Sequence, residues 1–149
     1  METNDNANQR VQKILVVEDN KQTRELMQLF FKKAQERRDL NCIVVESEDG
    51  EEAMIMLESE QPDIILCDIG LPKKDGFEVL DYFRNIRNPA TPYCFFTFIT
   101  ASPEERSKAF KERVDGFISK GDLNYFNFTL QIRSWLKLAE LERERENFY

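Results

Sequence analysis

The sequence DIILCDIGLPKKDG, residues 63–76, contains one complete junction between a strand and a helix. An apolar run at 64–67 leads into Asp68, a turn containing Pro72 follows, and Gly76 opens an amphipathic segment. A strand, a turn and a helix form the repeating unit of α/β proteins. Because the run is apolar throughout and does not alternate with polar residues, we expect a strand that is covered on both faces of a parallel sheet.

The same unit recurs along the chain. Four more apolar runs lie at 14–17, 43–45, 94–99 and 117–118. Helical patterns lie at 21–35, 50–59, 76–87, 103–112 and from Asp122 onward. Five strand–helix units predict an α/β fold with a doubly wound five-stranded parallel sheet, flanked by five helices, of which the last is extended.

Composition excludes several classes of function. The chain has 149 residues, which favours a single domain, and a net charge of -7, which argues against nonspecific binding of nucleic acid. It contains no histidine, so it has no histidine-based zinc site or Ser-His-Asp triad. Three widely spaced cysteines indicate buried thiols in a reducing compartment. No apolar stretch could span a membrane, and no signal peptide is visible, so we expect a cytoplasmic protein.

Polar residues follow four of the five expected strands, where function sits in such folds. Glu18 and Asp19 follow the first strand, Asp68 the third, Thr100 the fourth and Lys120 the fifth. Clustered carboxylates need a cation, and hard oxygen ligands suit Mg²⁺ or Mn²⁺. Asp68 could then act as a nucleophile toward phosphorus, while a hydroxyl and an ammonium group stabilise the transferred phosphoryl group.

Each of these residues also has a simpler interpretation. Glu18 and Asp19 could cap the following helix, Asp68 could be a loop carboxylate, and Thr100 could stabilise a turn. Lys120 could be a solvated surface charge. Their occurrence together at four separate strand ends favours a site.

In these motifs the chain resembles the receiver domain of two-component response regulators, from about Lys13 to about Ala139. The matching pieces are ILVVEDN at 14–20, the stretch 63–76, FITA at 98–101 and GFISK at 116–120. The resemblance implies a flavodoxin-like, CheY-like fold and a single-domain response regulator. Such a protein accepts a phosphoryl group from a sensor histidine kinase or a histidine phosphotransfer protein. It signals through a phosphorylation-dependent contact with a downstream protein and catalyses only its own phosphorylation and dephosphorylation.

The resemblance also assigns roles to residues around the acids. Asp68 matches the phosphoacceptor. The metal ligands would be Glu18, Asp19, Asp68 and the backbone carbonyl of Gly70. The residues that bind the phosphoryl group or respond to it would be Thr100, Lys120, the small Ala101 and the switch aromatic Phe117. As an aromatic residue of the fifth strand, Phe117 could instead be simply buried in the core.

Two positions depart from the family pattern. Gly121 follows Lys120, where the family usually has proline joined by a cis bond, so the position of Lys120 is an open question. Gly70 and Ser102 occupy the positions that influence hydrolysis in the family. Since neither presents an acid or an amide to orient water, we expect slow self-dephosphorylation.

The last helix is longer than the family requires. Tyr125, Phe128, Ile132 and Trp135 recur at helical spacing and could pack in the core or form a surface for a partner or a homodimer. We expect a disordered lead-in at 1–12, a receiver domain at 13–139 and a charged, solvated helical extension at 140–149. Neither the length nor the charge of the extension suits a DNA-binding domain.

Other functions have less support. A degenerate receiver could act as a constitutive interaction module. A phosphohydrolase with an aspartate nucleophile usually has a second acid where this chain has Gly70, and a P-loop needs Lys and Ser/Thr where it has Asp122 and Leu123. The LPKKDG loop, the absent proline and the tryptophan in the last helix are similar to those of stand-alone receivers paired with bacterial phytochromes.

Overall fold

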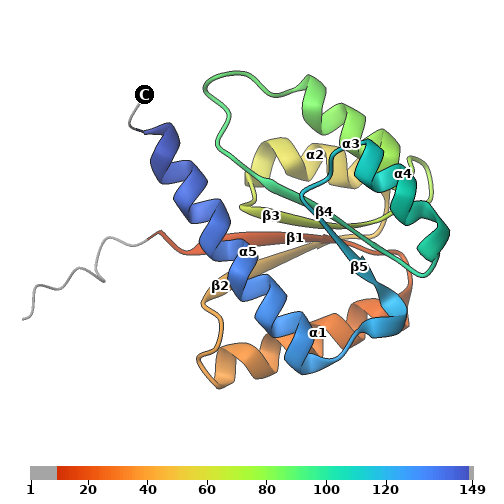
Figure 1. Ribbon diagram of the computed structural model, residues 1–149, viewed down its shortest axis with the longest axis vertical. Coiled ribbons are helices and arrows are strands. Elements are labelled where there is room, and N and C mark those ends of the chain that lie inside the picture. The colour runs from red at the N-terminus through yellow and green to blue at the C-terminus, as the bar shows by residue number, and fades with distance from the viewer. Residues whose placement is uncertain (1–9, 148–149) are drawn as a thin grey trace, which may run out of the picture.

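The computed structural model describes residues 10–147 and contains one sheet of five parallel strands in the order β2-β1-β3-β4-β5 (Figure 1). The strands are β1 (Gln12–Val17), β2 (Cys42–Ser47), β3 (Ile64–Asp68), β4 (Phe95–Thr100) and β5 (Gly116–Ser119). The helices are α1 (Lys21–Glu36), α2 (Gly50–Glu60), α3 (Gly76–Asn85), α4 (Arg106–Lys111) and α5 (Tyr125–Glu146), with short 3-10 turns at Pro103–Glu105 and Lys120–Asp122. The expected doubly wound fold is confirmed.

The helices cover both faces of the sheet. α1 and α5 pack on one face, and α2, α3 and α4 pack on the other (Figure 1). This arrangement buries β3 and β4 along their whole length, which explains their uninterrupted apolar runs. No helix among residues 10–147 is both long enough and apolar enough to cross a bilayer.

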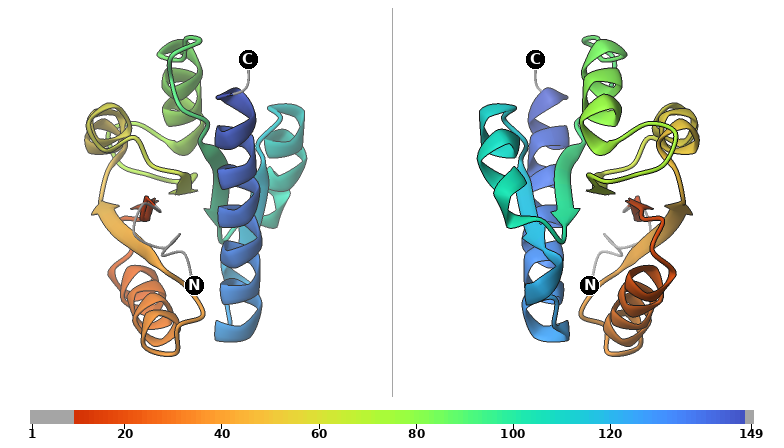
Figure 2. Two further views of the ribbon diagram at one scale, coloured as in Figure 1. Left: turned by 90° about the vertical axis from the view of Figure 1, so that its left-hand side faces the viewer. Right: turned by 90° about the vertical axis from the view of Figure 1, so that its right-hand side faces the viewer.

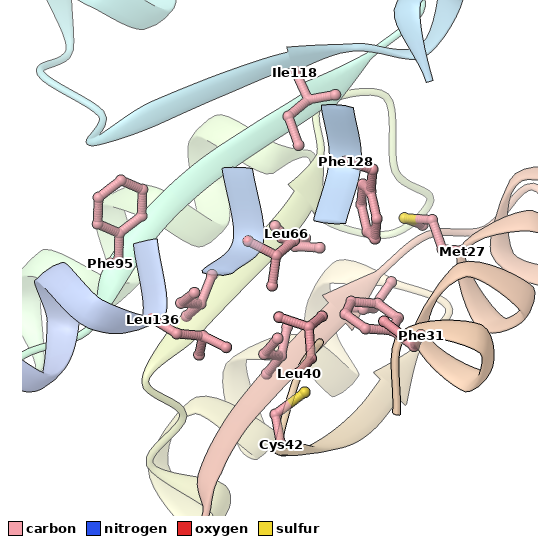
Figure 3. Close-up of a cluster of buried hydrophobic side chains, with 14 of the residues drawn as sticks. Met27, Phe31, Leu40, Cys42, Leu66, Phe95, Ile118, Phe128 and Leu136 are labelled. Carbon is pink, nitrogen blue, oxygen red and sulfur yellow. The ribbon is translucent and has the colours of Figure 1, made fainter. Parts of the chain in front are cut away.

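The core beneath α5 is built from aromatic and branched side chains (Figure 3). Phe128 packs against Phe31 of α1, with ring centroids 5.2 Å apart and the rings nearly perpendicular. Leu66 of β3 and Leu136 of α5 belong to the same cluster. α5 and α1 together therefore close this face of the sheet.

Two of the four residues expected as a possible partner surface, Phe128 and Ile132, belong to this core, and the other two, Tyr125 and Trp135, are partly buried and pack against it. Phe128 and Ile132 are 2% and 0% exposed. The Trp135 ring stacks on the Phe95 ring, with the ring centroids 5.1 Å apart. The Tyr125 hydroxyl donates a hydrogen bond to the Asp39 carboxylate at 3.0 Å. The core alternative holds for Phe128 and Ile132, whereas Tyr125 and Trp135 keep part of their surface exposed.

The end of α5 is helical as expected, but one of its charged side chains, Arg143, is anchored to the domain and is not solvated. α5 continues without a break to Glu146. The Arg143 guanidinium donates hydrogen bonds to the carbonyls of Tyr93, Pro62 and Gln61, at 2.7, 3.0 and 3.2 Å. It also pairs with the buried Asp63 at 3.2 Å. The last turns of α5 therefore lie against the loops at the amino ends of β3 and β4.

The beginning of the described chain is also ordered against the sheet. β1 starts at Gln12, one residue before the expected domain boundary, and the side chain of Arg10 pairs with Asp63. The rest of the expected lead-in, residues 1–9, and the end of the expected extension, residues 148–149, lie outside the described residues.

α1 begins at Lys21 as expected but has a different cap, and α5 begins three residues later than expected, at Tyr125. Asn20 caps α1 by accepting a hydrogen bond from the Thr23 N–H, so neither Glu18 nor Asp19 is the cap. Asn124 caps α5, because residues 120–122 form a 3-10 turn. Glu18 and Asp19 are therefore available for another role.

Candidate functional site

The strand order brings four of the expected site residues to one edge of the sheet. β1 and β3 are neighbours, β4 follows β3, and β5 follows β4. The carboxyl ends of these strands carry Glu18, Asp68, Thr100 and Lys120. Glu18 and Asp68 are buried, with exposures of 0% and 6%. Two carboxylates removed from water at this edge require a compensating positive charge.

Lys120 provides that charge. Its Nζ donates hydrogen bonds to Glu18 Oε1 and to Asp68 Oδ2, each at 2.9 Å. Burial lowers the pKa of Lys120, but the hydrogen bonds and charges of Glu18 and Asp68 outweigh burial, so the net shift of its pKa is upward. The ammonium form therefore bridges the ends of β1 and β3, although Gly121 stands where proline was expected. The described residues contain no cis peptide bond.

Glu18 is the most perturbed acid of the site. Burial and the nearby Asp68 carboxylate raise the pKa of Glu18 to about 7, against the lowering effect of Lys120 and of the Asn20 N–H. The Asn20 N–H donates to Oε1 at 3.0 Å, whereas Oε2 is buried without a hydrogen-bond partner. A buried carboxylate oxygen without a hydrogen-bond partner is free to coordinate a cation.

The donor set fits a divalent cation. Glu18, Asp19 and Asp68 each offer a carboxylate oxygen, and these oxygens lie within 4.8 Å of one another. Mg²⁺ favours one or two carboxylates together with waters, and Asp19 is exposed to solvent. The residues present therefore fit the expected Mg²⁺ or Mn²⁺.

Gly76 shapes the loop that follows Asp68. The Gly76 N–H donates to the Ile69 carbonyl at 2.7 Å. A Cβ at this position would lie 2.5 Å from the Asp68 carbonyl oxygen, which leaves no space for a side chain. Asp75 and Glu78 then form a capping box that begins α3. The sequence places Gly76 at the start of a helix, but its close approach to Asp68 appears only once the loop has folded back.

Arg24 is a second residue that the sequence analysis missed. Its guanidinium donates to the Glu18 carbonyl at 3.0 Å and pairs with Glu46 and Glu48 around β2, at 3.6 and 3.2 Å. It therefore fixes the chain that carries the acid pair. No signal in the sequence identifies it, because the pairing of β1 with β2 must be known first.

Comparison with known proteins identifies the family. The family model described as the response regulator receiver domain matches residues 14–124. The chain belongs to the response regulator receiver family. Receiver domains are the signalling modules of phosphorelays, and all four expected site segments lie within the matched residues.

Several relatives are similar to this receiver. An uncharacterized 14.6 kDa protein of Leptolyngbya boryana is 28% identical over 72% of this chain and 77% of its own length. The Regulator of RpoS of Escherichia coli K12 is 31% identical over 74% of this chain, but the match covers only 31% of that longer protein. The structure of the phosphorylated cyanobacterial phytochrome response regulator RcpA has a TM-score of 0.66 at 28% identity, covering 84% of this chain and 91% of RcpA.

The remaining residues with expected roles surround the acids of the receiver. Thr100 is buried, and its hydroxyl accepts a hydrogen bond from the Ser102 N–H at 3.1 Å. Ala101, Ser102 and Gly70 are exposed, which leaves the approach to Asp68 open. Adding a Cβ at Gly70 would meet nothing within 4 Å.

Phe117 of β5 packs against the core on the face of the sheet that α4 covers. It is half-buried, and its ring stacks on that of Phe110 of α4, with the ring centroids 6.4 Å apart. The Arg106 guanidinium carbon lies over the Phe117 ring, 5.9 Å from its centroid. Phe117 is one of the partly buried side chains that pack against the core on this face, so it combines a core contact with an exposed portion. Its ring connects the strand of Lys120 to α4.

Proposed function

We propose that this receiver is a phosphorylation switch of a cytoplasmic phosphorelay, with Asp68 as the phosphoacceptor. The observation that carries the proposal is the Lys120 ammonium, which lies 2.9 Å from a carboxylate oxygen of both Glu18 and Asp68. Oδ2 of Asp68 accepts from Lys120, and no donor among residues 10–147 contacts Oδ1. One oxygen of Asp68 is thus held, and the other is free to attack.

The proposed physiological donor is a phosphohistidine, which must belong to another protein because the chain has no histidine of its own. The Asp68 carboxylate forms a P–O bond while the P–N bond to the donor imidazole breaks. The bonding electrons return to the imidazole, which takes up a proton. A sensor histidine kinase or a histidine phosphotransfer protein would supply that imidazole, and the likeness to RcpA supports a kinase of the phytochrome class.

The transferred group would meet positive charge from the chain itself. Lys120 is positioned to move its hydrogen bond from Asp68 to a phosphoryl oxygen. Glu18, Asp19 and Asp68, with the Gly70 carbonyl, would hold Mg²⁺ or Mn²⁺. The bound ion supplies positive charge that offsets the charge on the phosphoryl oxygens.

The response would pass through Thr100 and Phe117. In the structure the Thr100 hydroxyl accepts from the Ser102 N–H, so it can donate its proton to a phosphoryl oxygen. A shift of Thr100 and the β4–α4 loop would change the packing of Phe117 on Phe110, and with it a surface that a downstream protein can read. Ala101 leaves the approach open for this movement.

Binding of beryllofluoride, a phosphoryl mimic, tests the switch. With Mg²⁺ present, we expect backbone NMR shifts at Asp68, Thr100 and Phe117 in the wild type. Asp68→Asn should show none of them, whereas Asp81→Asn, at an exposed position of α3, should behave like the wild type. A folded wild type that shows no shift at these residues would favour the degenerate receiver that acts as a constitutive interaction module.

A further inference from the structure

The turn between β2 and α2 lies beside the loop that follows the expected phosphoacceptor. The turn consists of residues 47–50 and is called the β2–α2 turn, and the loop consists of residues 69–75 and is called the acceptor loop. The right view of Figure 2 faces this edge of the sheet and shows α2 nearly end-on, with the segment that leads into α3 beside it. The carboxylate cluster of the site includes no residue of the turn. The turn can therefore act on the site only through its contacts.

On one side, the β2–α2 turn holds the chain that carries the acid pair. The Ser47 carbonyl accepts a hydrogen bond from the Glu18 N–H at 3.0 Å. This bond continues the pairing of β1 with β2, in which Val17 lies opposite Ser47. The Ser47 side chain is buried, and its hydroxyl donates to the Asp49 carbonyl at 2.8 Å. One residue thus fixes both the backbone of Glu18 and the middle of the turn.

On the other side, the β2–α2 turn is bonded to the acceptor loop. The Gly50 N–H donates to the Pro72 carbonyl at 3.3 Å, and the Lys74 N–H donates to the same oxygen at 2.8 Å. The Lys73 ammonium pairs with the Asp49 carboxylate at 3.5 Å. The acceptor loop is therefore attached to the start of α2 at two consecutive residues.

Gly50 permits this close approach. A Cβ at this position would lie 2.0 Å from the Lys74 carbonyl oxygen and 2.6 Å from the Lys74 Cβ, so a side chain would force the acceptor loop away from α2. No glycine among the described residues has a positive φ, so the backbone conformation does not require glycine here. Intrinsic helix propensity also favours alanine over glycine. The contact with the acceptor loop is therefore what requires Gly50.

We propose that the β2–α2 turn sets the spacing between the acid pair and the acceptor loop, with Gly50 as its positioning residue. One end of the turn fixes the backbone of Glu18, and the other end fixes the loop that carries the Gly70 carbonyl. Mg²⁺ demands near-ideal octahedral geometry with ligands at about 2.0–2.1 Å, so a shift of one part against the other weakens its binding. The inference rests on the proposed function in one respect, namely that these oxygens bind Mg²⁺.

A calorimetric titration of the full chain with Mg²⁺ tests the effect on the site. Gly50→Ala should raise the Mg²⁺ dissociation constant by about tenfold, as residues that orient metal ligands do. Leu57→Ala is the control, because Leu57 is buried two turns further along α2. It should weaken the packing of α2 and leave the dissociation constant within about twofold of the wild type. An unchanged constant in a folded Gly50→Ala, or an equal rise in Leu57→Ala, would overturn the proposal.

A milder variant keeps the test independent of whether Gly50→Ala folds. Ser47→Ala removes only the hydrogen bond from the Ser47 hydroxyl to the Asp49 carbonyl. It should raise the Mg²⁺ dissociation constant by about threefold. Thr129→Ala is the matched control, because it removes a buried hydroxyl that has no hydrogen-bond partner among residues 10–147. Ser47→Ala and Thr129→Ala binding Mg²⁺ equally well would contradict the role of the turn.

Backbone NMR of the metal-free protein measures the position of the acceptor loop directly. Gly50→Ala should move the amide signals of Gly70, Leu71 and Lys73, whereas Leu57→Ala should leave them in place. Unmoved signals in a folded Gly50→Ala would overturn the proposal. None of these measurements uses a phosphoryl donor, so a failure of phosphorylation would contradict the proposed function and not the positioning by Gly50.

Discussion

The guanidinium of Arg143, near the end of α5, lies 3.2 Å from the carboxylate of Asp63, which is fully buried before β3. Asp63 also accepts a hydrogen bond from the Lys13 N–H at 2.7 Å and pairs with Arg10. Both ends of the described chain therefore meet at one carboxylate, on the edge of the sheet opposite the acid site.

This relationship predicts a specific loss of stability. Arg143→Ala removes one of two charges that compensate a buried carboxylate, along with three hydrogen bonds to loop carbonyls. We expect the free energy of unfolding to fall by about 1–3 kcal/mol. Arg145→Ala, at a largely exposed arginine two residues later, should change it by less than about 0.5 kcal/mol. Urea unfolding measures both, and equal effects would show that the Asp63 contact is energetically unimportant.

Gly76 provides a test of the acceptor loop. Gly76→Ala forces a Cβ to within 2.5 Å of the Asp68 carbonyl oxygen, a backbone atom that cannot move aside without shifting the site. We expect a loss of about 1–3 kcal/mol of stability and weaker Mg²⁺ binding. In Gly121→Ala the nearest atom is Ser119 Oγ at 3.8 Å, so that variant should retain both properties. Thermal unfolding and a Mg²⁺ titration compare the two, and a fully stable Gly76→Ala would contradict the geometry.

Glu18 predicts a pH dependence in the absence of metal. Its pKa is raised from 4.5 to about 7 on folding, so the folded state holds a proton that the unfolded state has released. The free energy of unfolding should therefore fall as pH rises from about 4.5, and this contribution should level off above pH 7. Glu18→Gln, which cannot ionise, should lose this part of the slope.

Adding Mg²⁺ should oppose this fall in the free energy of unfolding with rising pH, because the ion favours the ionised form of the Glu18 carboxylate. At pH 8, Mg²⁺ should stabilise the wild type more than Glu18→Gln. Equal stabilisation of both proteins would show that Glu18 is not a ligand. Thermal melts with and without Mg²⁺ at several pH values provide the comparison.

The phosphorylated form should be long-lived. Gly70 has no side chain and Ser102 presents only a short hydroxyl, so neither can orient a water as an acid or amide would. We expect the acyl phosphate to persist for minutes in Mg²⁺ buffer, and Gly70→Asn, whose Cβ meets nothing within 4 Å, should shorten its lifetime. The release of inorganic phosphate measures the decay. Decay of the wild-type acyl phosphate within seconds would contradict this prediction.

Much of the fold and the site followed from the sequence because the signals are local. The apolar runs before Asp68 and Thr100 mark strands buried on both faces, and the polar residue at each end marks the functional edge. The strand order β2-β1-β3-β4-β5, which makes Glu18 and Asp68 neighbours, is not visible in any one segment. Family resemblance supplied the roles of these residues, and the structure supplied their contacts.

The last helix shows where local patterns fail. Tyr125, Phe128, Ile132 and Trp135 follow helical spacing, but spacing alone cannot tell which of two apolar faces meets the sheet. Arg143 was grouped with solvated charges because its partner, Asp63, lies 80 residues earlier in the chain. Such pairings depend on tertiary contacts, which a pattern along one helix does not contain.

The central claim is that Asp68 is the phosphoacceptor, and the intact mass of the protein tests it most directly. Wild type and Asp68→Asn would be incubated with acetyl phosphate and Mg²⁺ and then measured at once. We predict that the wild type gains the mass of one phosphoryl group and that Asp68→Asn gains none while remaining folded. An equal gain in Asp68→Asn, or no gain in a folded wild type, would contradict the account.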